Sequence, residues 1–249
     1  MDLRLKGVSF LRQHKAVLTD VSAVIPACGL TCLLGANGAG KTTLLRILSG
    51  ELKATSGEYF IGDIDASALS QRELAKYYAV IPQNPPTPPY LTVSEMVGMG
   101  RFQPRRALWW HLAEHDRAMT DACLARCQLG EFRNRRLDEI SGGEQRRAWL
   151  AFGLASDKRF LMLDETLDGM DIFAKRNFFQ LLRDIASGGK GILLTTHDLD
   201  VVSEFADRVI VLSGGRAVFE GAPSSSLAHL LSASSVPDGA GTVSRREAN

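Results

Sequence analysis

A glycine-rich stretch constrains the fold of this chain more than any other part of the sequence. Residues 35–42, Gly-Ala-Asn-Gly-Ala-Gly-Lys-Thr, fit the pattern G-x-x-x-x-G-K-[ST]. A short apolar run typical of a buried strand precedes them, and apolar residues at helical spacing follow. In this setting the loop backbone and the helix N-terminus both offer N–H groups to an anion. We therefore predict a phosphate-binding loop, the alternative being a glycine turn before an ordinary helix.

The loop pattern also assigns roles to single residues. Glycines let the backbone wrap close to phosphate oxygens, where side chains would collide. Lys41 would reach the β- and γ-phosphates of a nucleoside triphosphate, and the Thr42 hydroxyl would ligate Mg²⁺. The expected phosphate-binding residues are Gly35, Ala36, Asn37, Gly38, Ala39, Gly40, Lys41, Thr42 and Thr43.

Length and charge limit the remaining possibilities. With 249 residues, the chain can form one large α/β domain or a core with a smaller lobe. A formal net charge of +1 gives no argument for nucleic acid, and no such partner is expected. No stretch approaches the ~20 apolar residues of a membrane span. Residues 1–6 lack the apolar segment of a signal peptide, so we expect a soluble chain that reaches a membrane only through a partner.

The four cysteines form no dense framework, which predicts reduced thiols in a cytosolic protein. Cys123 and Cys127 lie four residues apart and would share one face of a helix. A metal site there would need further ligands, and only His111 and His115 lie nearby in the sequence. We therefore expect a packed helix face rather than a metal site.

Apolar runs alternate with helical patterns along the chain, which predicts an α/β fold with a parallel sheet and crossover helices. A turn is expected at 55–58. Strands are expected over 2–6, 17–25, 30–34, 59–63, 79–83, 160–163, 192–196 and 208–212. Helices are expected over 44–49, 71–77, 93–100, 116–127, 141–156, 172–187 and 199–205.

A proline-rich segment, residues 85–89, can be neither helix nor central strand and marks a boundary. The lobe that follows, 84–140, has mainly helical spacing. Its aromatic patch, residues 108–110 (Leu-Trp-Trp), is either core of that lobe or a surface for a protein partner. The last residues, 232–249, are rich in Ser, Ala and Gly and predict a mobile tail.

Two strands of the predicted sheet end in polar side chains that suit phosphate chemistry. Asp164 and Glu165 follow the apolar run 160–163, at the strand end where open α/β sheets bind ligands. Asp164 would share Mg²⁺ with Thr42, and Glu165 would act as general base on an attacking water. His197 ends the strand over 192–196, and we expect it to contact the γ-phosphate. The plainer alternatives are acidic helix caps and a surface histidine.

A second glycine pair, Ser141-Gly142-Gly143-Glu144-Gln145, precedes a long predicted helix. It makes another helix N-terminus suited to an anion. One chain does not need two such sites for one triphosphate, whereas in a dimer the second would close over the nucleotide of the other subunit. We therefore predict that Ser141, Gly142, Gly143 and Glu144 bind nucleotide across a dimer interface.

Taken together and in this order, these motifs resemble the ATPase subunit of an ABC transporter over about residues 1–225. The resemblance implies a mostly parallel sheet core (1–83 and 141–231, RecA-like) with an antiparallel β part and an inserted α-helical subdomain (84–140). It also implies a head-to-tail homodimer with two ATP molecules sandwiched between Lys41 of one subunit and Ser141 of the other. Gln83 would ligate Mg²⁺ and couple the nucleotide state to the helical lobe. Residues 168–171 would touch the opposite subunit.

Within that family the chain is similar to importer ATPases for iron–siderophores, haem and cobalamin. The similarity rests on residues 91–101, on 137–139 before the second glycine pair, and on 147–151 after it. It implies polytopic membrane permease partners, an extracytoplasmic substrate-binding protein reached indirectly, and a peripheral location on the cytoplasmic face of the inner membrane. We favour iron chelates as cargo. A soluble ABC ATPase of the cluster-assembly type, or a regulatory nucleotide-binding module that does not hydrolyse ATP, is the alternative.

Three positions depart from the family pattern. Arg12 stands where an aromatic side chain usually stacks on adenine, although a guanidinium can also stack on a base. Thr166 replaces the usual proline after the glutamate, which could alter the loop that follows. Leu167 and Asp168 replace a small polar pair and add a charge near the expected dimer interface.

Overall fold

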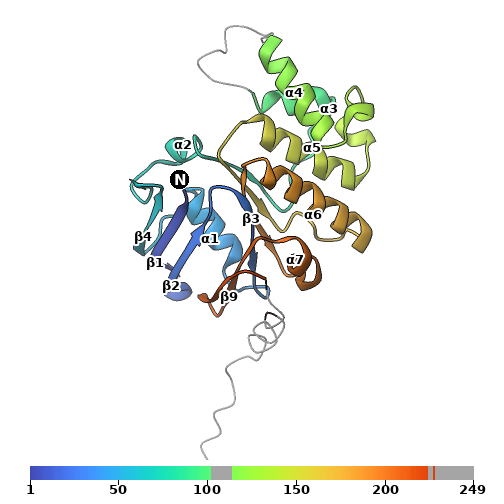
Figure 1. Cartoon of the computed structure of the whole chain (residues 1–249). Helices are drawn as coiled ribbons and strands as arrows, with labels where there is room; N and C mark the ends of the chain where they lie inside the picture. Colours follow the sequence, from blue (N-terminus) through green and yellow to red (C-terminus); the bar gives the residue numbers. More distant parts are fainter. Residues whose placement is uncertain (102–113, 224–226, 228–249) are drawn as a thin grey trace, which may run out of the picture.

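The computed structural model describes residues 1–101, 114–223 and 227, in which strands form two sheets (Figure 1). The smaller sheet is antiparallel and holds the N-terminal strands in the order β2-β1-β4-β5. Alternating buried and exposed residues along β1 leave one of its faces free to pack on the core. The bounds are β1 Leu3–Arg12, β2 Lys15–Ile25, β4 Ser56–Ile61 and β5 Ile64–Asp65.

The larger sheet carries the core of the molecule, with strand order β10-β9-β3-β8-β7-β6. All neighbours within it pair in parallel except β9 and β10, which form an antiparallel hairpin. Strands β7 and β8 are buried at every residue, as expected for a parallel sheet covered on both faces. The bounds are β3 Gly29–Leu34, β6 Tyr78–Ile81, β7 Phe160–Asp164, β8 Gly191–Thr196, β9 Arg208–Ser213 and β10 Arg216–Gly221.

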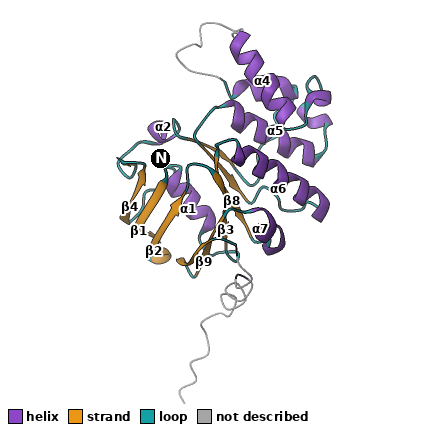
Figure 2. Ribbon diagram, in the orientation of Figure 1, coloured by secondary structure: helices purple, strands orange, loops and turns teal. Residues whose placement is uncertain are grey.

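Helices cover the larger sheet on both faces (Figure 2). Helix α1 packs between the two sheets in one apolar cluster, and α5, α6 and α7 pack on the other face in a second cluster. Helices α3 and α4 pack against α5 at the upper end of Figure 1. The bounds are α1 Lys41–Leu48, α2 Gln71–Leu74, α3 Val93–Met99, α4 Glu114–Arg126, α5 Gly142–Ala155, α6 Ile172–Ser187 and α7 Leu199–Phe205, with short 3₁₀ helices η2 Gly130–Phe132 and η3 Leu137–Glu139.

The predicted fold class is confirmed: an α/β core with a mostly parallel sheet, an antiparallel part and additional helices. Cys123 and Cys127 are buried in the apolar cluster that α4 shares with α5, so the expected packed face is confirmed as well. No group of three or more metal-ligating side chains occurs within 1–101, 114–223 and 227. No helix in the same ranges is long and apolar enough to cross a membrane.

Two local predictions were wrong, and one strand was missed. The turn expected at 55–58 lies largely inside β4, because Gly57 forms an irregularity in the pairing with β1. The helix expected over 71–77 ends at Leu74, since Tyr77 and Tyr78 already pair with the start of β7. Strand β10 was not expected at all. The patch at 108–110, His111 and the expected tail at 232–249 lie outside the described residues.

Candidate active site

The carboxyl ends of three neighbouring parallel strands bring the predicted site residues together. Strand β3 leads into the glycine loop at 35–40, β7 ends at Asp164 and β8 ends at Thr196. The register pairs Leu34 with Thr196 and Asp164 with Thr195, so the three strand ends lie level with one another. Residues far apart in the sequence thus meet at one edge of the sheet, where open α/β folds bind their ligands.

The loop between β3 and α1 has the backbone shape that its glycines permit. Gly40 caps α1 with φ of 102°, a left-handed conformation that favours glycine. A Cβ atom on Gly35 would lie 2.6 Å from the Leu212 carbonyl oxygen, so packing against β9 also requires a glycine there. The Lys41 ammonium donates hydrogen bonds to the carbonyl oxygens of Gly35 (2.7 Å) and Ala36 (3.2 Å). The loop is therefore closed around a buried cation.

The Lys41 ammonium also forms an ion pair with Glu165, at 3.0 Å from Nζ to Oε1. Both side chains are largely buried, with 4% and 14% of their surface exposed. The Glu165 backbone has φ of 41°, which is uncommon for a residue with a side chain and costs about 1–3 kcal/mol. Such strain persists where the surroundings fix it, and here it aims the carboxylate at the glycine loop.

A residue that the sequence analysis missed holds the two carboxylates in place. The Thr195 hydroxyl donates a hydrogen bond to Asp164 Oδ1 (2.8 Å) and accepts one from the Glu165 backbone N–H (2.8 Å). Thr195 is fully buried, so this hydroxyl has no competing water. The Thr42 hydroxyl donates to the same Asp164 oxygen at 3.2 Å. The sequence did offer a signal for this role, because Thr195 is a hydroxyl residue near the end of an otherwise apolar strand.

The residues expected to hold Mg²⁺ line one cavity of about 260 Å³. Thr42, Gln83 and Asp164 supply a hydroxyl, an amide and a carboxylate, and hard divalent cations such as Mg²⁺ prefer oxygen ligands. Gln83 uses its Nε2 group to donate to Glu165 Oε2 at 3.0 Å, which leaves its amide oxygen available. The donor set therefore fits Mg²⁺ held with nucleotide phosphates, as one carboxylate is sufficient for such a site.

Asp168 connects several of these residues. Its Oδ2 atom accepts a hydrogen bond from Gln83 Nε2 at 3.4 Å, and its Oδ1 atom lies 3.9 Å from His197 Nδ1. Its backbone carbonyl accepts a hydrogen bond from the Arg146 guanidinium at 2.6 Å. Both His197 and Asp168 are about half exposed, so their ion pair contributes little by itself. The structure thus places His197 at the rim of the site, beside β7 and the loop after it.

Ser141 and Glu144 form a capping box at the start of α5. The Glu144 side chain accepts from the Ser141 backbone N–H at 2.8 Å, and the Ser141 hydroxyl accepts from the Glu144 N–H at 3.3 Å. Gly142 is exposed and Gly143 partly so. Among the described residues, no hydrogen bond or ion pair joins this turn to the glycine loop of the same chain.

Arg12 lies at the exposed tip of the β1–β2 hairpin. The next two residues, Gln13 and His14, have φ of 48° and 66°, which is the backbone of a tight hairpin turn. The guanidinium forms no hydrogen bond or ion pair with the part of the chain that the structure describes. Stacking of Arg12 on a base therefore stays a prediction.

Comparisons with known proteins identify relatives along nearly the whole chain. The ABC transporter family profile matches residues 18–168. A hemin import ATP-binding protein of Bordetella pertussis is 35% identical over 236 residues, which cover 90% of this chain and 87% of that protein. In Bacillus subtilis, a petrobactin import ATP-binding protein is 32% identical (89% and 87% covered), and an iron(3+)-hydroxamate import ATP-binding protein is 31% identical (83% and 77% covered).

Solved structures show the same architecture. The ADP conformation of MJ1267, an ATP-binding cassette of an ABC transporter, superimposes with a TM-score of 0.83 at 24% identity, covering 93% of this chain and 95% of that one. For cbiO1 of Clostridium perfringens, part of an ABC transporter complex, the score is 0.80 at 26% identity, covering 92% of each chain. A dimeric structure of the ABC transporter cassette MJ0796 gives 0.74 at 25% identity, covering 89% and 99%.

Proposed function

This chain belongs to the ABC transporter family, and from that premise we propose that it is the ATP-hydrolysing subunit of an importer for an iron chelate. One observation carries the proposal. Lys41, Glu165 and Asp164 meet at the end of the parallel sheet, directly beside the glycine loop. The names of the relatives, which import hemin, petrobactin and iron(3+)-hydroxamate, support a cargo of this class.

The glycine loop and Lys41 bind the phosphates of ATP. In the structure the Lys41 ammonium is shared between two loop carbonyls and Glu165. A γ-phosphate carries more negative charge than one carboxylate, so it draws the ammonium away from Glu165. Nucleotide binding thereby releases the Glu165 carboxylate, which is then free to act on water. Thr42, Asp164 and Gln83 would hold Mg²⁺, which neutralises charge on the β- and γ-phosphates when it is bound.

Hydrolysis requires a water in line with the γ-phosphate and a group that accepts its proton. Glu165 is that general base, because its strained backbone and the Thr195 hydrogen bond aim its carboxylate at the phosphate side of the loop. Lys41 and His197 stabilise the negative charge that develops on the phosphate oxygens. These groups are fixed before the reaction, so little reorganisation is needed when charge develops.

The second glycine turn acts in a dimer. We propose that Ser141, Gly142, Gly143 and Glu144 close over the nucleotide of the opposite subunit, with residues 168–171 at the same interface. The exposure of Gly142 and the solved dimeric cassette similar to this chain support this arrangement. Opening and closing would drive permease subunits through a helical lobe, 84–140, set into the core 1–83 and 141–231. The subunit would then lie on the cytoplasmic face of the inner membrane.

Purification from native membranes tests this function. The tagged chain is extracted with detergent, and its partners are identified by mass spectrometry. A permease with many membrane spans supports the importer, and the substrate-binding protein that works with this permease names the cargo, whether an iron chelate, haem or cobalamin. A soluble partner would instead indicate a cluster-assembly type of ABC ATPase and refute the transport role, while leaving the ATPase chemistry intact.

A further inference from the structure

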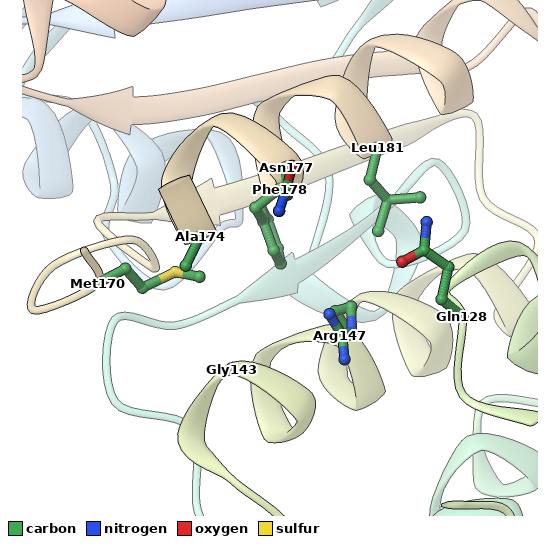
Figure 3. A pocket seen from close by; sticks show the side chains of 8 residues that line it. All are labelled: Gln128, Gly143, Arg147, Met170, Ala174, Asn177, Phe178 and Leu181. Carbon is green, nitrogen blue, oxygen red and sulfur yellow. The ribbon is translucent and has the colours of Figure 1, made fainter. Parts of the chain in front are cut away.

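A second cavity lies between helices α5 and α6, apart from the glycine loop (Figure 3). Its volume is about 120 Å³, room for about four water molecules at roughly 30 Å³ each. A tetrahedral oxyanion needs a comparable space. The lining residues are Gln128, Gly143, Arg147, Met170, Ala174, Asn177, Phe178 and Leu181, and none of them carries a negative charge.

Among the described residues, Arg147 is the only charged one that lines this cavity. Figure 3 shows its side chain rising from α5 toward α6, between Gln128 and Phe178. Its Nε atom is buried without a hydrogen-bond partner, and the guanidinium forms no hydrogen bond or ion pair with residues 1–101, 114–223 or 227. A buried donor left unsatisfied costs about 1–3 kcal/mol, so an acceptor that reaches the Nε atom of Arg147 would remove this cost.

Two side-chain amides complete a set of hydrogen-bond donors. Asn177 on α6 and Gln128, just after α4, both line the cavity. Gln128 has φ of 57°, a left-handed conformation that glycine usually adopts after a helix. A Gln at that position accepts backbone strain, and its side-chain amide lies at the edge of the cavity (Figure 3). One guanidinium and two amides without a carboxylate are a set suited to an oxyanion.

We propose that this cavity binds a free oxyanion of the size of inorganic phosphate, held by Arg147, Gln128 and Asn177. Gln128 and Asn177 are exposed, so the cavity opens to solvent and a free ion can enter it. The three donors lie outside the glycine loop, so the proposal stands without the ATPase function, although the cavity adjoins the turn and the loop proposed above to lie at the dimer interface. Gly143 and Met170 also line it, so a bound ion would join α5 to the loop that precedes α6 and hold both segments in place.

Thermal unfolding of the full chain in sodium phosphate, compared with sodium chloride at equal ionic strength, detects such binding. The glycine loop also binds phosphate, so the comparison is made in a Lys41→Ala background that weakens that site. An ion at ten times its Kd shifts the folding equilibrium elevenfold. For a chain of this size, the midpoint should rise by about 3–6 °C. Adding Arg147→Gln should abolish the rise, while Arg183→Gln, which removes an exposed charge elsewhere on α6, should preserve it.

An equal rise with and without Arg147→Gln would overturn the proposal. If that variant does not fold, Asn177→Leu is the second test, and it should reduce phosphate affinity about tenfold through loss of one amide donor. Selenate soaked into crystals of the wild-type chain locates the ion directly by its anomalous signal. A peak within hydrogen-bond distance of the Arg147 guanidinium supports the site. A peak at the glycine loop alone, or none, refutes it.

Discussion

Replacing Thr195 by valine tests how the two carboxylates proposed to act in catalysis, Asp164 and Glu165, are held. Valine has nearly the same shape, so no cavity forms, but both hydrogen bonds of the hydroxyl are lost. Asp164 keeps its contact with Thr42, whereas the Glu165 N–H loses its only partner among the described residues. A buried N–H without a partner costs about 1–3 kcal/mol. We expect the free energy of unfolding to fall by about 2 kcal/mol and the midpoint by about 4–8 °C.

The effect on catalysis should exceed the effect on stability. Without the hydrogen bond, the Glu165 backbone relaxes from its strained conformation, and its carboxylate moves away from the attacking water. A displacement of about 1 Å lowers turnover roughly a hundredfold. The assay is steady-state ATP hydrolysis well below the unfolding midpoint, with Thr195→Ser, which retains the hydroxyl, as the control. Wild-type kcat in the valine variant, together with the expected loss of stability, would show that Thr195 only packs the core and would refute the positioning argument.

Three further outcomes follow from other residues. Thr166→Val should raise the free energy of unfolding by about 1 kcal/mol in a urea titration, because it removes a buried hydroxyl without a partner; a decrease would contradict this. Asp168→Ser should lower kcat about two- to tenfold with little change in KM, since Gln83 loses an acceptor; an altered KM alone would argue against it. In the native chain only the exposed Cys28 should react rapidly with a thiol reagent at pH 8, whereas all four cysteines should react in denaturant. Burial raises the pKa of the other three thiols, those of Cys32, Cys123 and Cys127, and keeps them protonated at pH 8. Rapid reaction of more than one thiol would contradict this.

Sequence reasoning succeeded where local pattern and tertiary burial agree. Helix α6 has the predicted bounds, because Asp171 caps its first turn and apolar residues recur along the face packed on the sheet. The glycine loop was predictable for the same reason, because the patterns that indicate its flanking strand and helix lie directly beside it in the sequence. The meeting of Thr42 with Asp164 followed from the rule that parallel strands gather their carboxyl ends at one edge.

Features set by pairing between distant segments were not predictable. Gly57 by itself suggests a turn, yet the residue lies in a strand that passes close to Gly7 on β1. A Cβ atom on Gly57 would lie 2.3 Å from the Gly7 carbonyl oxygen. No residue of strand β10 is fully buried, so its apolar signal is weak, although the Gly214–Gly215 turn before it was a usable hairpin cue. The role of Thr195 and the contacts of Asp168 depend on register across the sheet.

The most direct test of the central claim compares ATP hydrolysis by the wild-type chain and Glu165→Gln at saturating Mg-ATP. Glutamine fits the same space but cannot accept a proton, so turnover should fall by about 10²–10⁴-fold. Binding of ATP should be retained or strengthened, because Lys41 no longer has a carboxylate competing with the γ-phosphate. Equal turnover in the two proteins would contradict the account, since it would show that Glu165 is not the base that activates water.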